Sequence, residues 1–112
     1  MIEEKILKLV AEALQVPVHM EIPADRPSSF VVLKRSGEGR KNLVEDSMLI
    51  ADSYAESLYE AAKLNKQVKS VLDDLVDTLD DICSVQLSAD YPVTDTGSKQ
   101  HRYQAVYKIS HY

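Results

Sequence analysis

Residues 57–79 carry the strongest pattern in this chain. Apolar side chains recur there every three or four residues, which is the spacing of one face of an α-helix. The residues on this face are Leu58, Ala61, Ala62, Val68, Val71, Leu72, Leu75, Val76 and Leu79. At a rise of 1.5 Å per residue, such a helix spans roughly 35 Å, about the width of a small domain. The rest of the chain must therefore pack along it.

The sequence also predicts how this helix begins and what its opposite face carries. Ser57 followed by Glu60 is typical of a capping box, in which each side chain satisfies a backbone donor at the helix start. The opposite face carries a stripe of charged side chains, typical of a solvated surface: Lys63, Lys66, Lys69, Asp73, Asp74, Asp77 and Asp80. A helix that is apolar on one side needs a partner layer, which predicts a helix laid across a sheet.

The flanking segments supply that sheet. An apolar face at helical spacing predicts a first helix over residues 2–14, which should end before Pro17. Alternating or β-branched runs predict strands over residues 18–22, 30–35, 47–54, 82–90 and 102–110, with turns at 37–42 and 91–100. The order α-β-β-β-α-β-β predicts an α+β fold with a mostly antiparallel sheet of about five strands, backed by two helices.

Two residues within these strands invite a specific interpretation. Asp52 interrupts the alternation of Met48, Ile50 and Tyr54, so we expect its strand to lie near an edge of the sheet or to face a partner. Cys83 stands among apolar residues at a strand start. We expect it to be a small buried hydrophobic residue, because a single cysteine forms no internal disulfide and nothing marks it as reactive.

Size and charge narrow the function classes. A chain of 112 residues suits one domain, over residues 1–112, and no apolar run is long enough to span a bilayer. Met1 to Lys5 do not resemble a secretory signal. A net charge of −5 argues against general nucleic-acid binding. The charge is uneven, since residues 30–43 are basic and residues 56–81 are acidic; these could meet between subunits or form two solvated patches.

The sequence offers no recognisable catalytic or metal-binding pattern. His19, His101 and His111 are widely separated, and no Cys-x-x-Cys or His-Glu-x-x-His is present. Gly37-x-Gly39 lies in a predicted hairpin rather than between a strand and a helix, so it does not match a phosphate-binding loop. The aspartates of residues 73–81 lack the glycine-bearing loop of calcium sites. We therefore expect no enzyme, no cofactor and no metal.

Several short motifs together resemble the tail terminator, or tail completion, proteins of long-tailed bacteriophages and prophages. The matching segments are VPVHMEIP (16–23), RP (26–27), FVVLKRSGEG (30–39), DSYA (52–55) and RYQA (102–105). They follow one another in the family's order over almost the whole chain. The chain departs from the pattern in residues 43–47, which are less turn-like than the family's return arm.

The resemblance implies a structural protein. Members of this family form a ring, commonly of six copies, that caps the tail tube, stops its polymerisation and offers a surface for head joining. The implied partners are other copies of the chain, the tail tube protein and a head-tail connector protein, in a virion assembled in the host bacterial cytoplasm. On this basis we expect five residues to contribute to subunit or tube contacts: Arg35, Arg40, Lys41, Asp95 and Arg102.

Two other classes remain open at this stage. One is a different head-tail connector component that acts at the portal side. The other is a monomeric host binding module or small enzyme of the same fold class, which would require a defined pocket with converging polar groups. The mass of the protein in solution at several concentrations separates the ring from the monomer.

Overall fold

The structure is a computed structural model that describes residues 2–25, 27–41, 44–93 and 100–112; for residues 37–41 and 44–45 it describes the backbone alone. Its elements are α1 (Ile2–Leu14), β1 (Val18–His19), β2 (Phe30–Lys41), β3 (Val44–Ala55), α2 (Leu58–Asp73), α3 (Leu75–Thr78), β4 (Ile82–Val93) and β5 (His101–His111). The predicted α+β fold and its element order are confirmed, with the long helix divided into α2 and α3.

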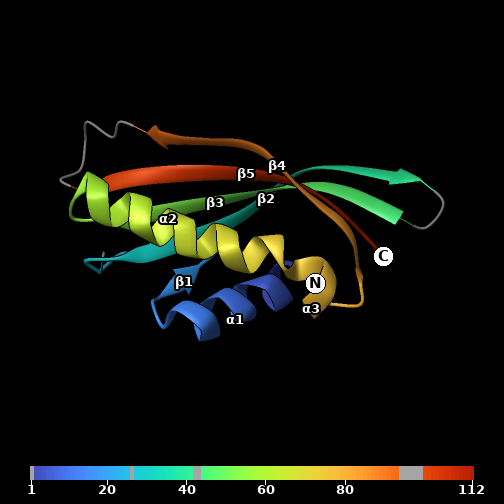
Figure 1. Ribbon diagram of the computed structural model, residues 1–112, viewed down its shortest axis with the longest axis horizontal. Coiled ribbons are helices and arrows are strands. Elements are labelled where there is room, and N and C mark those ends of the chain that lie inside the picture. Colours follow the sequence, from blue (N-terminus) through green and yellow to red (C-terminus); the bar gives the residue numbers. More distant parts are fainter. Residues whose placement is uncertain (1, 26, 42–43, 94–99) are drawn as a thin grey trace.

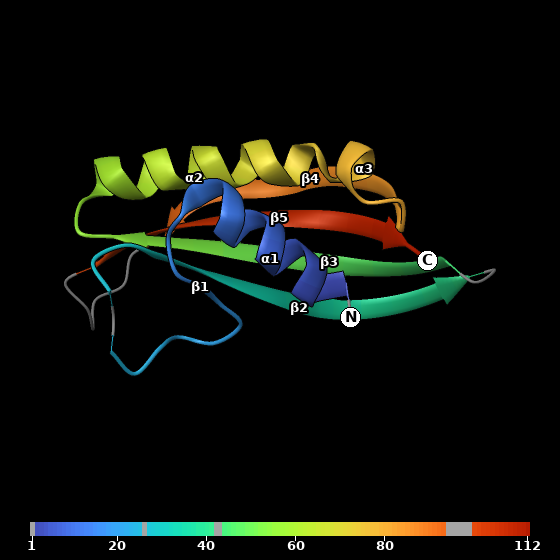
Figure 2. The same cartoon turned by 90° about the horizontal axis from the view of Figure 1, so that it is seen from below.

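The five strands form one open sheet in the order β1-β2-β3-β5-β4. Every neighbouring pair is antiparallel except the short β1, which pairs in parallel with β2. Figures 1 and 2 show α1 and α2 on the same side of this sheet. The β2–β3 hairpin extends past the helices at one end of the molecule. The other face of the sheet therefore has no helix over it.

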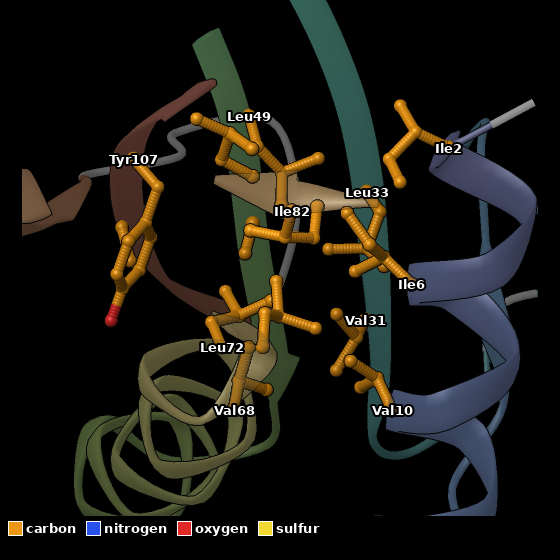
Figure 3. Packing of buried hydrophobic residues seen from close by; sticks show 14 of the residues in the cluster. Ile2, Ile6, Val10, Val31, Leu33, Leu49, Val68, Leu72, Ile82 and Tyr107 are labelled. Carbon is orange, nitrogen blue, oxygen red and sulfur yellow. The ribbon is translucent and has the colours of Figure 1, made fainter. Parts of the chain in front are cut away.

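The main core fills the space between the helices and the sheet (Figure 3). Ile6 and Val10 of α1 meet Val31 of β2, while Val68 and Leu72 of α2 lie over β3 and β5. Burying each such side chain contributes about 1.5–3 kcal/mol relative to leaving it exposed. This contact explains why both amphipathic helices share one face of the sheet.

The boundaries of the helices follow from local chemistry. Helix α1 ends where Gln15 adopts a left-handed φ of 55° while its N–H donates to the Ala11 carbonyl at 2.9 Å. At the start of α2 the Ser57 hydroxyl accepts from the Glu60 N–H at 3.1 Å, which confirms this half of the predicted capping box. The continuous helix to residue 79 was wrong, because Asp74 leaves helical geometry (φ −92°, ψ 2°) and divides it.

The β2–β3 hairpin is longer than predicted. β2 continues through Gly37 and Gly39 to Lys41, so the turn expected over residues 37–42 was wrong for most of that range. The register shifts between Ser36 and Glu38, so Gly37 is accommodated as a bulge rather than a turn. The return strand begins at Val44 instead of residue 47. Residues 44–47 of the less turn-like return arm thus belong to a strand, and residue 43 lies outside the described residues.

Other strand boundaries also differ from those predicted. The first strand contains only Val18 and His19, and the side chains of Met20 and Ile22 beyond it are exposed. β4 continues to Val93, three residues past the predicted end, which moves Tyr91 to Val93 out of the predicted loop. The rest of that loop, residues 94–99, lies outside the described residues.

Two predictions about individual residues were wrong. The strand of Asp52 does not lie near an edge, because β3 has strands on both sides and only 1% of the residue is exposed. The alternative, that this strand faces a partner, stays a prediction. Cys83 is exposed, because β4 is an outer strand and its register shifts between Ile82 and Ser84. That shift breaks the strict alternation on which the prediction depended.

Candidate functional site

The helix-free face of the sheet carries a small charged and aromatic cluster. We define the Asp52 cluster as Phe30, Lys34, Asp52, Tyr54 and Arg102. β2 supplies the first two residues, β3 the next two and β5 the last. The strand register places Phe30 opposite Tyr54 and Tyr54 opposite Arg102, so side chains distant in sequence lie in one row across the sheet.

Asp52 is a buried carboxylate at the centre of this cluster. Only 2% of its side chain is exposed, and its Oδ2 lies 3.8 Å from the Arg102 Nη1 and 4.0 Å from the Lys34 Nζ. Its Oδ1 is buried with no hydrogen-bond partner among the described residues. Burial raises the pKa of Asp52, while the charges of Arg102 and Lys34 act in the opposite direction.

Arg102, the β5 residue of the cluster, contacts both Tyr54 and Asp52. Its guanidinium carbon lies 5.7 Å from the centre of the Tyr54 ring, and its Nη1 donates to the Tyr54 hydroxyl at 3.3 Å. The Tyr54 ring in turn stacks on Phe30, with centroids 4.5 Å apart and planes 6° apart. Arg102 is therefore held by an ion pair, a hydrogen bond and a cation–π contact of its own chain.

Arg35 is also engaged within the chain, on the opposite face of the sheet. Its Nε forms an ion pair with the Glu3 Oε1 of α1 at 2.6 Å, and this carboxylate is nearly buried. Arg35 pairs with Leu49 and Arg102 with Tyr54 along β3, which separates them by five residues, or roughly 17 Å of strand. The structure does not bring these two predicted contact residues together.

For the other three predicted contact residues, Arg40, Lys41 and Asp95, the structure describes the backbone at most. Arg40 and Lys41 are the last residues of β2, at the projecting end of the hairpin, and their side chains lie outside the description. Asp95 lies outside the described residues. The charge of the hairpin end is therefore known from sequence, and its position from the backbone (Figure 1).

Sequence reasoning singled out Asp52 and Arg102 but missed Phe30, Lys34 and Tyr54 and the contacts that join the cluster. Asp52 was noticed as an interruption of an apolar alternation, which is the signal of a buried charge as well as of an edge strand. Nothing in the sequence pairs it with Arg102, because the two are 50 positions apart and meet only through the β3–β5 register.

A shallow groove lies where β1 ends. It has a volume of about 430 Å³ and is lined by Glu3, Met20, Leu33, Lys34 and Arg35. Three of these residues are consecutive on β2, and Met20 directly follows β1. The groove therefore follows the outer side of β2 from the point at which its β1 neighbour stops.

The chemistry of the described residues is that of contacts rather than of an evident reaction centre. Within the described chain, no three His, Cys, Asp or Glu side chains gather closely enough to hold a metal ion. Ser47 and His111 approach at 3.5 Å, but both are nearly fully buried, so the pair is closed to a substrate. None of the helices described is long and apolar enough to cross a membrane.

Comparisons with known proteins find likenesses among solved structures. No family model matches the sequence, and no curated protein is similar to it. Among solved structures, the chain is similar to a chain in the virion of a native gene transfer agent (GTA) particle. The likeness covers 96% of this chain and 90% of that chain, with a TM-score of 0.57 and 9% identical residues. At this identity the likeness shows a shared fold over nearly the full length of both chains.

Proposed function

We propose that this chain is a structural component of a phage-type virion, and specifically a tail terminator that closes the end of the tail tube as a ring. The observation that carries the proposal is the fold likeness to a chain of a GTA virion, which extends over nearly all of both chains. The motifs that resemble tail terminators lead to the same class from the sequence side. A structural role also agrees with the Asp52 cluster, in which Asp52 forms ion pairs with Lys34 and Arg102 of the same chain.

The shape of the protein supports assembly. The sheet is open, with β1 and β4 as its outer strands, and a hairpin projects past the helices. The hairpin end carries Arg40 and Lys41, whereas α2 and α3 carry exposed aspartates. Unlike surfaces of this kind suit a head-to-tail contact, which closes into a ring when its rotation divides the circle.

The proposal includes the partners and the place of action. The ring, commonly of six copies in the family that the sequence resembles, would contact the tail tube protein on one side and a head-tail connector protein on the other. It would be a virion component assembled in the bacterial cytoplasm, and it would act without catalysis or a cofactor.

The mass of the purified protein at several concentrations tests the ring. Native mass spectrometry should show a closed oligomer, and negative-stain images should show annular particles. Added to the tube protein of the same virion, the protein should shorten the tubes that grow. A monomer at all concentrations, with no effect on tube length, would contradict the proposal. A position at the portal in a virion reconstruction would indicate the connector instead.

Charge reversal tests the hairpin contact. Arg40→Glu with Lys41→Glu should weaken association roughly five- to thirty-fold, since two rim charges contribute about 0.5–1 kcal/mol each. Lys8→Glu with Lys108→Glu is the matched control, because it changes the net charge equally at two exposed lysines outside the hairpin, α2 and α3. An unchanged mass distribution in the hairpin variant, or an equal loss in the control, would contradict this contact.

A further inference from the structure

The sheet has two outer sides that could accept another strand. On one side, β1 pairs only with Val31 and Val32, so among the described strands none lies beside β2 from Leu33 to Lys41. On the other side, ten of the twelve residues of β4 pair with β5, and no other described strand lies beside β4. Unpaired strand edges are templates for pairing with another chain, and natural proteins usually protect them.

β4 has part of that usual protection, because its register against β5 shifts twice and Pro92 lies near its end, but it has no charge directed to solvent. Its single charged side chain, Asp90, is directed to α2, where it accepts a hydrogen bond from Asn65 at 2.8 Å and forms an ion pair with Lys69. Leu87 and Tyr91 are exposed, at 43% and 44%. An outer strand of this length, with two exposed apolar side chains and no free charge, can accept a partner strand.

The outer side of β2 offers a seat for such a strand. The groove of about 430 Å³ lies beside Leu33, Lys34 and Arg35, directly after β1 ends. Glu3 and Met20 form its sides, so it continues the line of β1 along the sheet. The backbone of β2 then extends to Lys41, which gives nine residues for pairing.

We propose that β4 of a second copy adds to the outer side of β2, antiparallel to it, so that one sheet continues from subunit to subunit. This inference rests on the proposed ring and specifies its contact. The direction follows from the topology: β2, β3, β5 and β4 are antiparallel in turn, so β2 and β4 run in opposite directions in one copy. A second copy in the same orientation presents β4 antiparallel to β2.

Charge supports this direction. The start of β4 at Ile82 follows Asp77 and Asp80, which are exposed. The antiparallel arrangement places this start beside the end of β2, where Arg40 and Lys41 lie. Asp77 and Asp80 then lie at the same end of the sheet as Arg40 and Lys41, which share that end with Glu38, Glu45 and Asp46; a parallel arrangement would separate the two aspartates from the two basic residues.

A proline on the outer side of β4 tests the pairing. Directly opposite residues in antiparallel sheets alternate between hydrogen-bonded and non-bonded pairs. The Val31 N–H donates to the Pro17 carbonyl on the outer side of β2, and following the alternation across the sheet places the Leu87 N–H on the outer side of β4. Pro92 already occupies this strand, as an outer strand allows.

Leu87→Pro should therefore retain the monomer fold and reduce the assembled fraction by at least about tenfold. Leu87→Ala is the matched control, because it shortens the same side chain and keeps the N–H; it should assemble within about twofold of the wild type. The measurements are native mass spectrometry and circular dichroism. A folded Leu87→Pro variant that assembles like the wild type would overturn the proposal.

Cross-linking decides the question even if the proline variant does not fold. Among the antiparallel registers that place all of residues 33–41 beside β4, one puts the exposed Cys83 opposite Arg40 of the next copy and one puts it opposite Lys41, at the strand spacing that a disulfide requires. Oxidised Arg40→Cys or Lys41→Cys protein should form covalent chains longer than dimers. Arg40→Cys with Cys83→Ser can form dimers at most, and it is the control. Rings without such chains would overturn this contact and leave the proposed function standing; a wild-type monomer would overturn both.

Discussion

Truncation of Arg102 should destabilise the monomer, because this side chain compensates a buried charge. Removing one partner of a buried ion pair costs about 3–5 kcal/mol when the other charge keeps no partner. Lys34 stays 4.0 Å from the Asp52 Oδ2, so we take about 2 kcal/mol for Arg102→Ala. Loss of the Tyr54 ring and hydroxyl contacts adds about 1 kcal/mol. The expected loss is about 3 kcal/mol.

This loss is large enough to measure by thermal unfolding. For 112 residues the unfolding entropy is about 240 cal/mol/K, so the melting temperature should fall by about 12 °C. Circular dichroism melts at one fixed, low protein concentration are required, since ring formation would raise the melting temperature by mass action. Lys108→Ala is the control: it removes an exposed cation from the same strand and face, and should change stability by at most about 0.5 kcal/mol.

A double variant isolates the charge. In Arg102→Ala with Asp52→Asn there is no buried carboxylate to compensate, so the loss relative to Asp52→Asn alone should shrink to about 1 kcal/mol. Additive effects of the two substitutions, or equal melting temperatures for the Arg102 and Lys108 variants, would refute this account of the cluster. A loss of assembly in a fully stable Arg102→Ala protein would instead support a contact role.

Three further predictions concern the same fold. Burial raises the pKa of Asp52 in the folded chain above its ordinary value of 3.8. The stability of the wild type should therefore fall relative to that of Asp52→Asn as the pH rises from 3.8 through the raised pKa. A constant difference between the two proteins in urea unfolding would contradict this prediction. Tyr107→Phe should lose about 1 kcal/mol, since the Tyr107 hydroxyl donates to Asp73 at 2.9 Å; equal melting temperatures would exclude this. Leu75→Ala should lower the free energy of unfolding by about 2–5 kcal/mol because Leu75 is buried, and Val76→Ala by under about 1 kcal/mol because Val76 is 44% exposed. An unbroken helix would place both residues on its apolar face, so similar losses in calorimetry would contradict the division of the helix.

The sequence by itself determined the elements and their class. Helix α1 was predicted with its exact bounds, and β5 within one residue at each end. These features follow from hydrophobic periodicity, which is set by the geometry of a single segment and needs no knowledge of its neighbours. The same reasoning gave the α+β class, because an apolar helix face requires a sheet or another helix against it.

Only the tertiary structure decided which strand is central and which is outer. Asp52 is buried because β5 pairs with the far side of β3, and Cys83 is exposed because no described strand lies beyond β4. The partners of Arg102 were likewise invisible in the sequence, although the residue itself was singled out. Strand order and register depend on contacts between distant segments, and a one-residue bulge moves a side chain to the other face. Local patterns contain no information on contacts between distant segments, so they predict the strands of this sheet but not their order or register.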